Sequence, residues 1–351
     1  MKKKLIFFVI PILVFSMFVF FNGGKKEEER EVVEKAQQYT WETTHGTFVL
    51  SERIAKKVAA GEKLIIRNST WDPSAPFFKD VRMGIDKAIN EFGFDYKMVG
   101  PADGVVEKQI SELETLIKAE QIDGLSITCG DADTMMPLFD MAWERGIPVV
   151  TYDCDSPKSK RLAYVGWEHP MIGAIGAKYL MKLHPEKTGK LATFAAFPEG
   201  VYARGRFEGF FKVLDENGYN LDVVGPFKLG LDMAEGYGVV ENTFLANPDI
   251  ELIYTVDEFV QVPAEYVKRN NLKGKVIVIG VNDLPGVLTY VREGIINQTT
   301  GINPAGQGYI TGKMLYEFIT TGKKAPEVTY VQLDEVTPEN VEEHMKAKGL
   351  L

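Results

Sequence analysis

Cysteine, histidine and positive charge are all scarce in this sequence, and each shortage excludes a class of protein. Two cysteines in 351 residues, Cys129 and Cys154, are too few for a disulfide framework. The formal net charge of -9 opposes the cationic surface that nucleic-acid binding requires, so we expect no nucleic-acid partner. No two of the four histidines stand at a metal-ligand spacing, so we expect no metal site. These histidines are His45, His169, His184 and His344.

Catalytic motifs are also missing. The sequence has no Gly-x-Ser-x-Gly nucleophile elbow, no Gly-x-x-x-x-Gly-Lys-Ser/Thr phosphate loop and no His-Glu-x-x-His motif. Carboxylates are common in any acidic protein, so pairs of them carry no signal for catalysis. We therefore expect a binding protein without a cofactor rather than an enzyme.

The N-terminus has the pattern of an export signal. Three lysines, Lys2 to Lys4, precede an apolar run of 17 residues from Leu5 to Phe21, which as a helix would span about 25 Å. That length is long for the core of a signal peptide and short for a membrane span. Cleavage of residues 1–24 and retention of residues 5–21 as a membrane anchor therefore both stay open. We expect a periplasmic or extracytoplasmic protein, with residues 25–61 as a polar spacer before the folded body.

From Leu64 onward, short apolar runs alternate with amphipathic stretches of helical periodicity. The runs are apolar on both faces, as the buried strands of a parallel sheet are. Strands before Gly166 and after Lys190 number about five each, too many for one compact sheet. The sequence therefore predicts an α/β fold of two doubly wound parallel-sheet lobes, with a cleft at the carboxyl ends of the strands.

Aromatic and charged side chains follow the predicted strands, where a doubly wound fold places its ligand. Trp71, Phe77 and Phe78 come after the first strand, and aromatic faces suit the C–H faces of a sugar ring. Asp153 directly follows its strand and can accept hydrogen bonds from two hydroxyl groups. Arg206 lies near the start of a predicted helix, where its guanidinium can point a rigid fork of donors into the cleft.

Asp257 and Asn282 follow two later strands and extend the predicted site. Each has an alternative role as a helix N-cap, and Phe77 or Phe78 has one in packing its helix against the sheet. The two cysteines follow strands that would be neighbours in the first lobe, so a disulfide and two buried free thiols both stay open. Four polar strand ends facing one cleft favour a polyhydroxylated ligand.

At these positions the chain resembles a known family, the type I periplasmic sugar-binding proteins of ABC importers, in particular the ribose- and glucose-binding group. Pro76-Phe77-Phe78, the strand that ends at Asp153, and the helix start Arg206-Phe207-Glu208-Gly209-Phe210 are similar to motifs of this group. The resemblance runs from Leu64 to the C-terminus. In that family the Asp and the Arg bind the hydroxyl groups of a sugar.

The resemblance implies a three-segment hinge between the lobes, with crossings near Gly166, Ile302 and Val328. Lobe 1 would then comprise residues 62–166 plus 303–327, and lobe 2 residues 167–302 plus 328–351.

Several residues depart from the ribose-binding pattern. Val256 stands where that group has Asn, Asn282 where it has Asp, and Cys154 where an Arg often follows the ligand Asp. Trp167 adds an aromatic side chain near the first hinge crossing. These changes argue against ribose itself and leave a hexose, a polyol or a cyclitol open.

The resemblance implies an exported solute-binding protein that closes on a sugar or polyol and delivers it to the membrane subunits of an ABC importer. The alternative is a membrane-tethered ligand sensor that feeds a signalling kinase. LacI-like repressors share this fold, but they need an N-terminal helix-turn-helix where this chain has an export signal. The residues expected to bind the ligand are Trp71, Phe77, Phe78, Asp153, Trp167, Arg206, Asp257 and Asn282.

Overall fold

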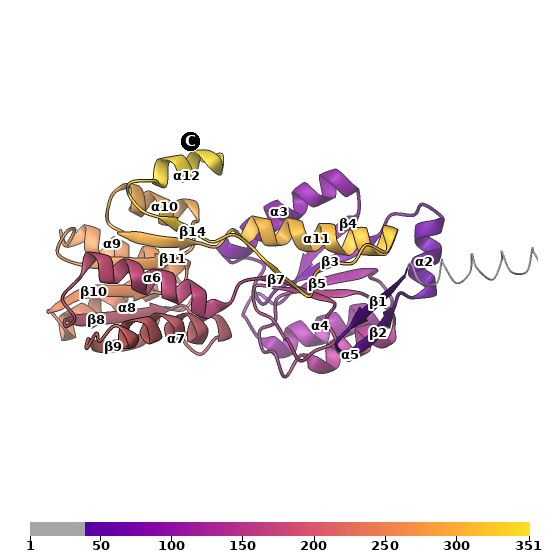
Figure 1. Cartoon of the computed structure of the whole chain (residues 1–351), viewed down its shortest axis with the longest axis horizontal. Helices are drawn as coiled ribbons and strands as arrows, with labels where there is room; N and C mark the ends of the chain where they lie inside the picture. Colours follow the sequence, from indigo (N-terminus) through magenta and orange to yellow (C-terminus); the bar gives the residue numbers. More distant parts are fainter. Residues whose placement is uncertain (1–38) are drawn as a thin grey trace, which may run out of the picture.

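The computed structural model describes residues 39–351, which form two lobes joined by three chain segments (Figure 1). The export signal or anchor predicted over residues 1–24 lies outside the described residues, as do residues 25–38 of the predicted spacer. Over residues 39–351, no helix has both the length and the hydrophobicity that a membrane span requires.

Lobe 1 is built on a six-stranded parallel sheet with the strand order β4-β3-β5-β6-β7-β13. Helices cover both of its faces, with α3 and α11 on one side and α4 and α5 on the other (Figure 1). The strands are β3 (Ile65–Ser69), β4 (Asp95–Val99), β5 (Gly124–Ile127), β6 (Val149–Tyr152), β7 (Ala163–Gly166) and β13 (Val328–Tyr330). The helices are α3 (Pro76–Phe92), α4 (Val106–Lys118), α5 (Met136–Glu144) and α11 (Pro304–Thr321).

Lobe 2 repeats this plan with the strand order β9-β8-β10-β11-β12-β14, in which only β14 is antiparallel to its neighbour. The strands are β8 (Lys190–Ala195), β9 (Asp222–Lys228), β10 (Ile250–Thr255), β11 (Ile277–Val281), β12 (Gln298–Gly301) and β14 (Asp334–Val336). The helices are α6 (His169–Leu183), α7 (Val201–Glu216), α8 (Met233–Ala246), η1 (Glu258–Val260), α9 (Gln261–Arg269), α10 (Pro285–Arg292) and α12 (Val341–Ala347).

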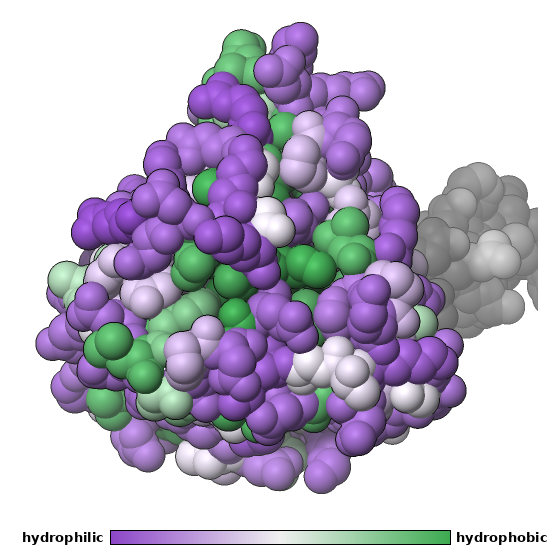
Figure 2. Space-filling view, turned by 90° about the vertical axis from the view of Figure 1, so that its left-hand side faces the viewer, coloured by the Kyte–Doolittle hydropathy of each residue, from purple (hydrophilic) through white to green (hydrophobic). Residues whose placement is uncertain are grey.

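Both faces of the lobe 2 sheet are buried, because adjacent residues of one strand pack into different hydrophobic clusters. In β10, Tyr254 packs with Phe210 of α7, whereas Ile253 packs with Val262 of α9. This explains why the strands are apolar on both faces in the sequence. The outer end of this lobe is mostly hydrophilic, with hydrophobic residues gathered in a recess (Figure 2).

The predicted fold class is confirmed: each lobe is a doubly wound, largely parallel sheet. The chain passes from β7 of lobe 1 to α6 of lobe 2 after Gly166, and from β12 of lobe 2 to α11 of lobe 1 around Ile302. The third crossing comes later than Val328. Val328–Tyr330 pairs with β7 in lobe 1, and the chain reaches lobe 2 only at Asp334.

The segment before the first sheet strand is folded, although residues 25–61 were predicted to be a spacer. A hairpin of β1 (Thr40–Thr43) and β2 (Gly46–Val49) precedes α2 (Glu52–Ala59). The rings of Trp41 and Phe48 pack on Phe318 of α11, with centroids 4.8 and 5.9 Å apart. Trp41 and Phe48 stand seven residues apart in the hairpin, so no strand or helix periodicity marks them as one buried side.

Asp123 fixes α2 to lobe 1. Its carboxylate is fully buried and accepts hydrogen bonds from Arg53 and Lys57 of α2 at 2.7 and 2.6 Å. It also accepts one from the backbone N–H of Ile65 at 2.7 Å. A buried carboxylate is tolerated only when it is paired in this way, so the cations of α2 and this acid stabilise each other.

We predict that Asp123→Asn lowers the free energy of unfolding by about 2 kcal/mol, because the substitution leaves two cations without their buried partner. Denaturant unfolding measures this. Glu52→Gln is the control, since Glu52 pairs with Lys56 on the exposed face of the same helix and should leave stability nearly unchanged. Equal effects of the two substitutions would contradict the role given to Asp123.

Candidate functional site

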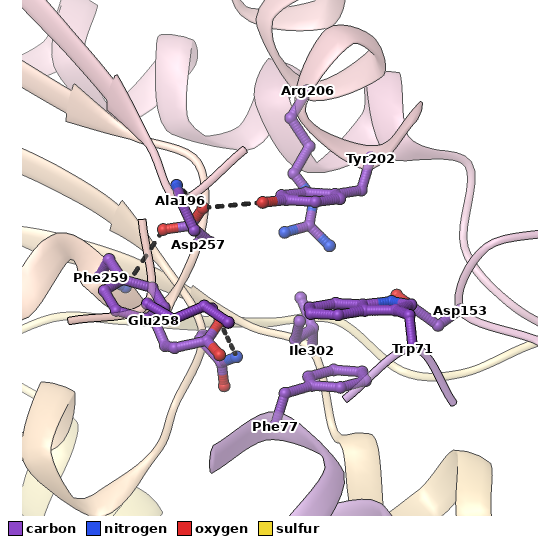
Figure 3. A pocket seen from close by; sticks show the side chains of 12 residues that line it. Trp71, Phe77, Asp153, Ala196, Tyr202, Arg206, Asp257, Glu258, Phe259 and Ile302 are labelled. Carbon is purple, nitrogen blue, oxygen red and sulfur yellow. Dashed lines mark hydrogen bonds between the residues drawn. The ribbon is translucent and has the colours of Figure 1, made fainter. Parts of the chain in front are cut away.

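A cavity between the lobes lies at the carboxyl ends of both sheets (Figure 3). Lobe 1 contributes residues that follow β3 and β6, lobe 2 contributes residues that follow β8, β10 and β11, and the second hinge crossing contributes Ile302. The residues that line the cavity are Trp71, Phe77, Asp153, Ala196, Tyr202, Arg206, Leu231, Asp257, Glu258, Phe259, Asn282 and Ile302. The sheets therefore converge on one site, as a doubly wound fold leads us to expect.

Six of the eight residues predicted to bind the ligand line this cavity. They are Trp71, Phe77, Asp153, Arg206, Asp257 and Asn282. No ligand is present, so the role of each in binding stays a prediction.

The structure places Phe78 and Trp167 elsewhere. Phe78 is fully buried beneath the cavity, with its ring edge-on to those of Trp71 and Phe77 at 5.0 Å. Successive residues of a helix point about 100° apart, so Phe77 and Phe78 cannot both face the cleft. Trp167 is buried in the first hinge crossing, where its backbone N–H donates to the Tyr164 hydroxyl at 2.9 Å.

Asp153 is held in a tight turn directly after β6. Its φ of 56° lies in the left-handed region, which is uncommon for a residue other than glycine and often marks a functional position. Its backbone N–H donates to Gln307 Oε1 at 2.9 Å, and its Oδ2 accepts from Thr128 Oγ1 at 3.3 Å. Burial raises the pKa of Asp153, and the positive charge of Arg206 opposes that shift.

Arg206 enters the cavity from lobe 2, whereas Arg204 on the same helix is exposed. The Arg206 side chain is 3% exposed, and its Nη1 donates to the Val256 carbonyl at 2.6 Å. Its Nε has no partner among the described residues. Figure 3 shows the guanidinium reaching past the Tyr202 ring into the space above Trp71. Arg206 is therefore fixed at one end and still has donors available for a ligand.

Two glycines set the position of Arg206. A Cβ added at Gly173 of α6 would lie 1.9 Å from the Arg206 carbonyl oxygen, and one added at Gly209 of α7 would lie 1.9 Å from the Pro170 carbonyl oxygen. Only glycine permits two helices to approach so closely. The backbone contact of α6 and α7 thus fixes the helix that carries the guanidinium.

Asp257 accepts three hydrogen bonds from the protein. It caps η1 by accepting from the Phe259 N–H at 3.1 Å, and it also accepts from the Ala196 N–H at 2.7 Å and the Tyr202 hydroxyl at 3.1 Å. The N-cap alternative considered for this residue is therefore realised. Asp257 shapes the lobe 2 wall by joining the ends of β8 and β10 to Tyr202.

The sequence analysis missed six residues of the cavity wall. Glu258 lies next to the predicted Asp257 at a strand end, and Tyr202 lies at the start of the helix that carries Arg206. These positions were the signal that could have predicted both residues. Burial and the neighbouring Asp257 charge raise the pKa of Glu258 to about 7. The residues missed are Ala196, Tyr202, Leu231, Glu258, Phe259 and Ile302.

The cavity is small. Its volume is about 30 Å³, well below the roughly 300 Å³ or more of a typical small-molecule site. Trp71 of lobe 1 touches Phe197 of lobe 2 edge-on, with ring centroids 6.0 Å apart. A second chamber of about 330 Å³ adjoins it and shares Trp71 and Tyr202 as walls. The first cavity as it stands is therefore too small for a sugar ring.

Both cysteines line that second chamber, and both are buried free thiols. The backbone N–H of Cys129 donates to the Cys154 carbonyl at 3.0 Å, so the two strands lie side by side as expected. Of the two options that the sequence left open, the structure has the free thiols.

Known proteins share the sequence pattern and the fold of this chain. Residues 68–324 match the family described as periplasmic binding protein domain. The ribose import binding protein of Bacillus subtilis (strain 168) is 27% identical over 254 residues, which cover 71% of this chain and 79% of that protein.

Solved structures agree with this match. An ABC transporter solute-binding protein from Burkholderia graminis in complex with D-arabinose is 27% identical, with a TM-score of 0.72, and the match covers 79% of this chain and 96% of that chain. A chain of the XylFII–LytSN complex has a TM-score of 0.72 at 22% identity, with coverage of 79% and 98%. The latter likeness shows the shared fold alone.

The raised pKa of Glu258 predicts how stability changes with pH. Between about pH 4.5, where the unfolded side chain titrates, and pH 7, the folded protein keeps a proton that the unfolded chain releases. The free energy of unfolding should therefore fall as pH rises through this window and lose this dependence above about pH 7. Glu258→Gln should make the fall shallower, as denaturant unfolding at several pH values measures.

Asp153 and Asp257 also have raised pKa values from burial, so part of the slope should remain in Glu258→Gln. The exposed Glu216 on α7 provides the control, because Glu216→Gln should leave the slope unchanged. A slope in Glu258→Gln equal to that of the wild type would exclude the proposed protonation of Glu258.

Proposed function

The chain belongs to the periplasmic binding protein domain family, and we propose that it is a solute-binding protein that closes on a sugar or polyol and delivers it to the membrane subunits of an ABC importer. One observation carries the proposal: Asp153 and Arg206, from opposite lobes, line the same buried cavity between aromatic rings. The relatives named as a ribose import binding protein and as a solute-binding protein in complex with D-arabinose support it.

The polar groups of the cavity suit hydroxyl groups. A hydroxyl both donates and accepts, so it can donate to the Asp153 carboxylate while its neighbour accepts from the Arg206 guanidinium. Charge-assisted hydrogen bonds in a buried site are stronger than neutral ones. Because Asp153 and Arg206 come from different lobes, one ligand that binds both also holds the lobes together.

The aromatic walls suit the remainder of a sugar. Trp71 and Phe77 come from lobe 1, and Tyr202 and Phe259 from lobe 2. Their faces can cover the C–H groups of a pyranose or cyclitol ring, which are apolar although the ring carries hydroxyls. The cavity thus offers donors and acceptors in one direction and apolar surface in another, as a polyhydroxylated ring requires.

Closure is the mechanism that this arrangement supports. In an open form the Asp153 and Arg206 surfaces separate and admit ligand, and the bound ligand then stabilises the closed form because only that form contacts it from both sides. An importer that recognises the spacing of the two lobes can distinguish the loaded protein from the empty one. Hinge closure of this kind needs no catalytic group, and the relatives reported above are named as binding proteins.

Membership of the family implies an extracytoplasmic location. We propose that the N-terminal segment provides export, with Lys2 to Lys4 and the run Leu5 to Phe21 as the signal. Whether residues 5–21 are cleaved or act as an anchor concerns residues that the structure does not describe.

A membrane-tethered ligand sensor is the second candidate function. The observation that favours it is the structural neighbour found in a complex with a second protein, LytSN. Both candidates use the same closed form and differ in the protein that recognises it. Co-purification of the ligand-bound protein with its membrane partner separates an importer permease from a signalling protein.

We predict that removing either half of the polar pair weakens binding. Asp153→Ala and Arg206→Ala should each raise the dissociation constant for the sugar or polyol ligand roughly 10- to 100-fold, because each leaves buried groups unpaired. Isothermal titration calorimetry measures the change. The exposed Lys212 on α7 gives the control variant, Lys212→Ala, which should bind as the wild type does.

Thermal unfolding of the same variants separates loss of binding from loss of fold, since Arg206 also bonds to the Val256 carbonyl. Wild-type affinity in a folded Asp153→Ala or Arg206→Ala variant would remove that residue from the site.

The proposal itself is tested with a panel of pentoses, hexoses, polyols and cyclitols after unfolding and refolding to remove any solute carried from the host. At least one neutral polyhydroxylated compound should raise the melting temperature and bind with a stoichiometry of one. If none did so under conditions where the protein is folded, the proposed function would be wrong.

A further inference from the structure

Three side chains of different chemistry meet behind the wall of the cavity. One ligand atom each from Asp153, Cys154 and His169 lies within 4.8 Å of the other two, and all three residues are buried. We propose that they form a binding site for a thiophilic divalent metal ion such as zinc. No local motif marks this cluster, because His169 stands more than a dozen residues after Asp153 and Cys154 along the chain.

His169 is the observation that points to a ligand. It is 9% exposed, and its imidazole interacts with the backbone of Asp153, while among the described residues no side chain donates to or accepts from either ring nitrogen. A buried polar group without a partner is costly, so native proteins seldom keep one without a role. A neutral imidazole nitrogen with a free lone pair is the commonest protein ligand for zinc.

The three donors come from both sides of the hinge. Asp153 and Cys154 follow β6 in lobe 1, and His169 is the first residue of α6 in lobe 2. The Tyr164 hydroxyl lies 2.8 Å from the carbonyl oxygens of both Asp153 and Trp167, which joins the Asp153 turn to the crossing segment. Atoms beside a hinge move least when lobes open, so the three donors should remain together in the open form.

The donor set selects the kind of metal. One sulfur, one nitrogen and one oxygen suit zinc or another borderline ion, and three protein ligands leave the fourth tetrahedral position open. Magnesium and calcium prefer oxygen alone and fit poorly. Arg206 lies close enough to act on the charge of all three donors, and it opposes a cation. Two anionic ligands, the Asp153 carboxylate and the Cys154 thiolate, are needed to offset the positive charge of Arg206. This again favours a metal that binds thiolate.

Binding releases one proton. The Cys154 thiol donates to Asp153 Oδ2 at 3.4 Å in the metal-free protein. On binding, the S–H bond breaks, its electron pair forms the metal–sulfur bond, and the proton leaves to solvent. No electron is transferred, and no further reactant is required.

Asp153 belongs to both sites, and this part of the inference rests on the proposed function. A carboxylate bound to metal cannot also accept hydrogen bonds from sugar hydroxyls with its full strength. Metal and sugar should therefore weaken each other's binding by the same factor.

The test uses the full-length protein, freed of metal by dialysis against a chelator and kept reduced. Cobalt(II) should add a sulfur-to-metal charge-transfer band in the near ultraviolet, and zinc should bind with a stoichiometry of one by calorimetry. Cys154→Ser should abolish the band, and both Cys154→Ser and His169→Gln should weaken zinc binding at least tenfold.

Cys129→Ser is the matched control. Cys129 is an equally buried thiol on the same chamber but lies outside the donor set, so this variant should keep the band and the affinity. No stoichiometric binding by the wild type, or binding that Cys154→Ser and His169→Gln leave unchanged, would overturn the proposal. Circular dichroism in the presence of chelator shows that each variant is folded.

Titration of sugar with and without zinc completes the test. A reciprocal loss of affinity supports the shared carboxylate, and independent binding of the two would overturn that part. A protein that bound zinc but no sugar, even with chelator present, would overturn the proposed function and leave the metal site standing.

Discussion

The hydroxyl of Tyr164 is the contact on which the cleft depends. Its proton is shared between the carbonyl oxygens of Asp153 and Trp167, and its oxygen accepts from the Trp167 N–H. Burial raises the pKa of Tyr164, so the hydroxyl keeps this proton at any ordinary pH. One side chain of β7 therefore holds the left-handed turn at Asp153 and the start of the hinge in a fixed relation. The Asp153 turn and the first crossing are thus joined through one side chain.

The opposite wall is fixed by backbone rather than by side chains. Gly173 and Gly209 let α6 and α7 touch, and α6 begins directly after the first crossing. The position of the helix that carries Arg206 is thus fixed relative to the hinge by its contact with α6. The position of Asp153 is fixed relative to the hinge by the hydrogen bonds of Tyr164. Asp153 and Arg206 are therefore both positioned by contacts with the first crossing, which fixes the distance between them in this closed form.

Much of this could be read from the sequence, because parallel strands bring consecutive strand ends to one edge. That rule alone placed Asp153, Arg206, Asp257 and Asn282 near each other. It could not decide whether Phe77 or Phe78 faces the cleft. Neighbouring residues of a helix point about 100° apart, so a shift of one residue exchanges the side chain that faces the cleft for one that faces the core.

Other features depend on contacts between distant segments. The fold of residues 40–59 rests on a buried acid far along the chain, Asp123, and a few aromatic rings on α11. The third crossing depends on whether Val328–Tyr330 pairs with β7, which short strands of low hydrophobicity do not reveal. The approach of His169 to Cys154 follows from the hinge geometry, and no local spacing encodes it.

The ring contact between Trp71 and Phe197 has a kinetic consequence. These rings meet across the cleft, and the cavity that Asp153 lines is too small for a sugar. In the proposed cycle of opening and closure, a sugar reaches Asp153 only after the lobes part, so the frequency of opening would limit the association rate. The contact between Trp71 and Phe197 would then act on both the uptake and the release of solute.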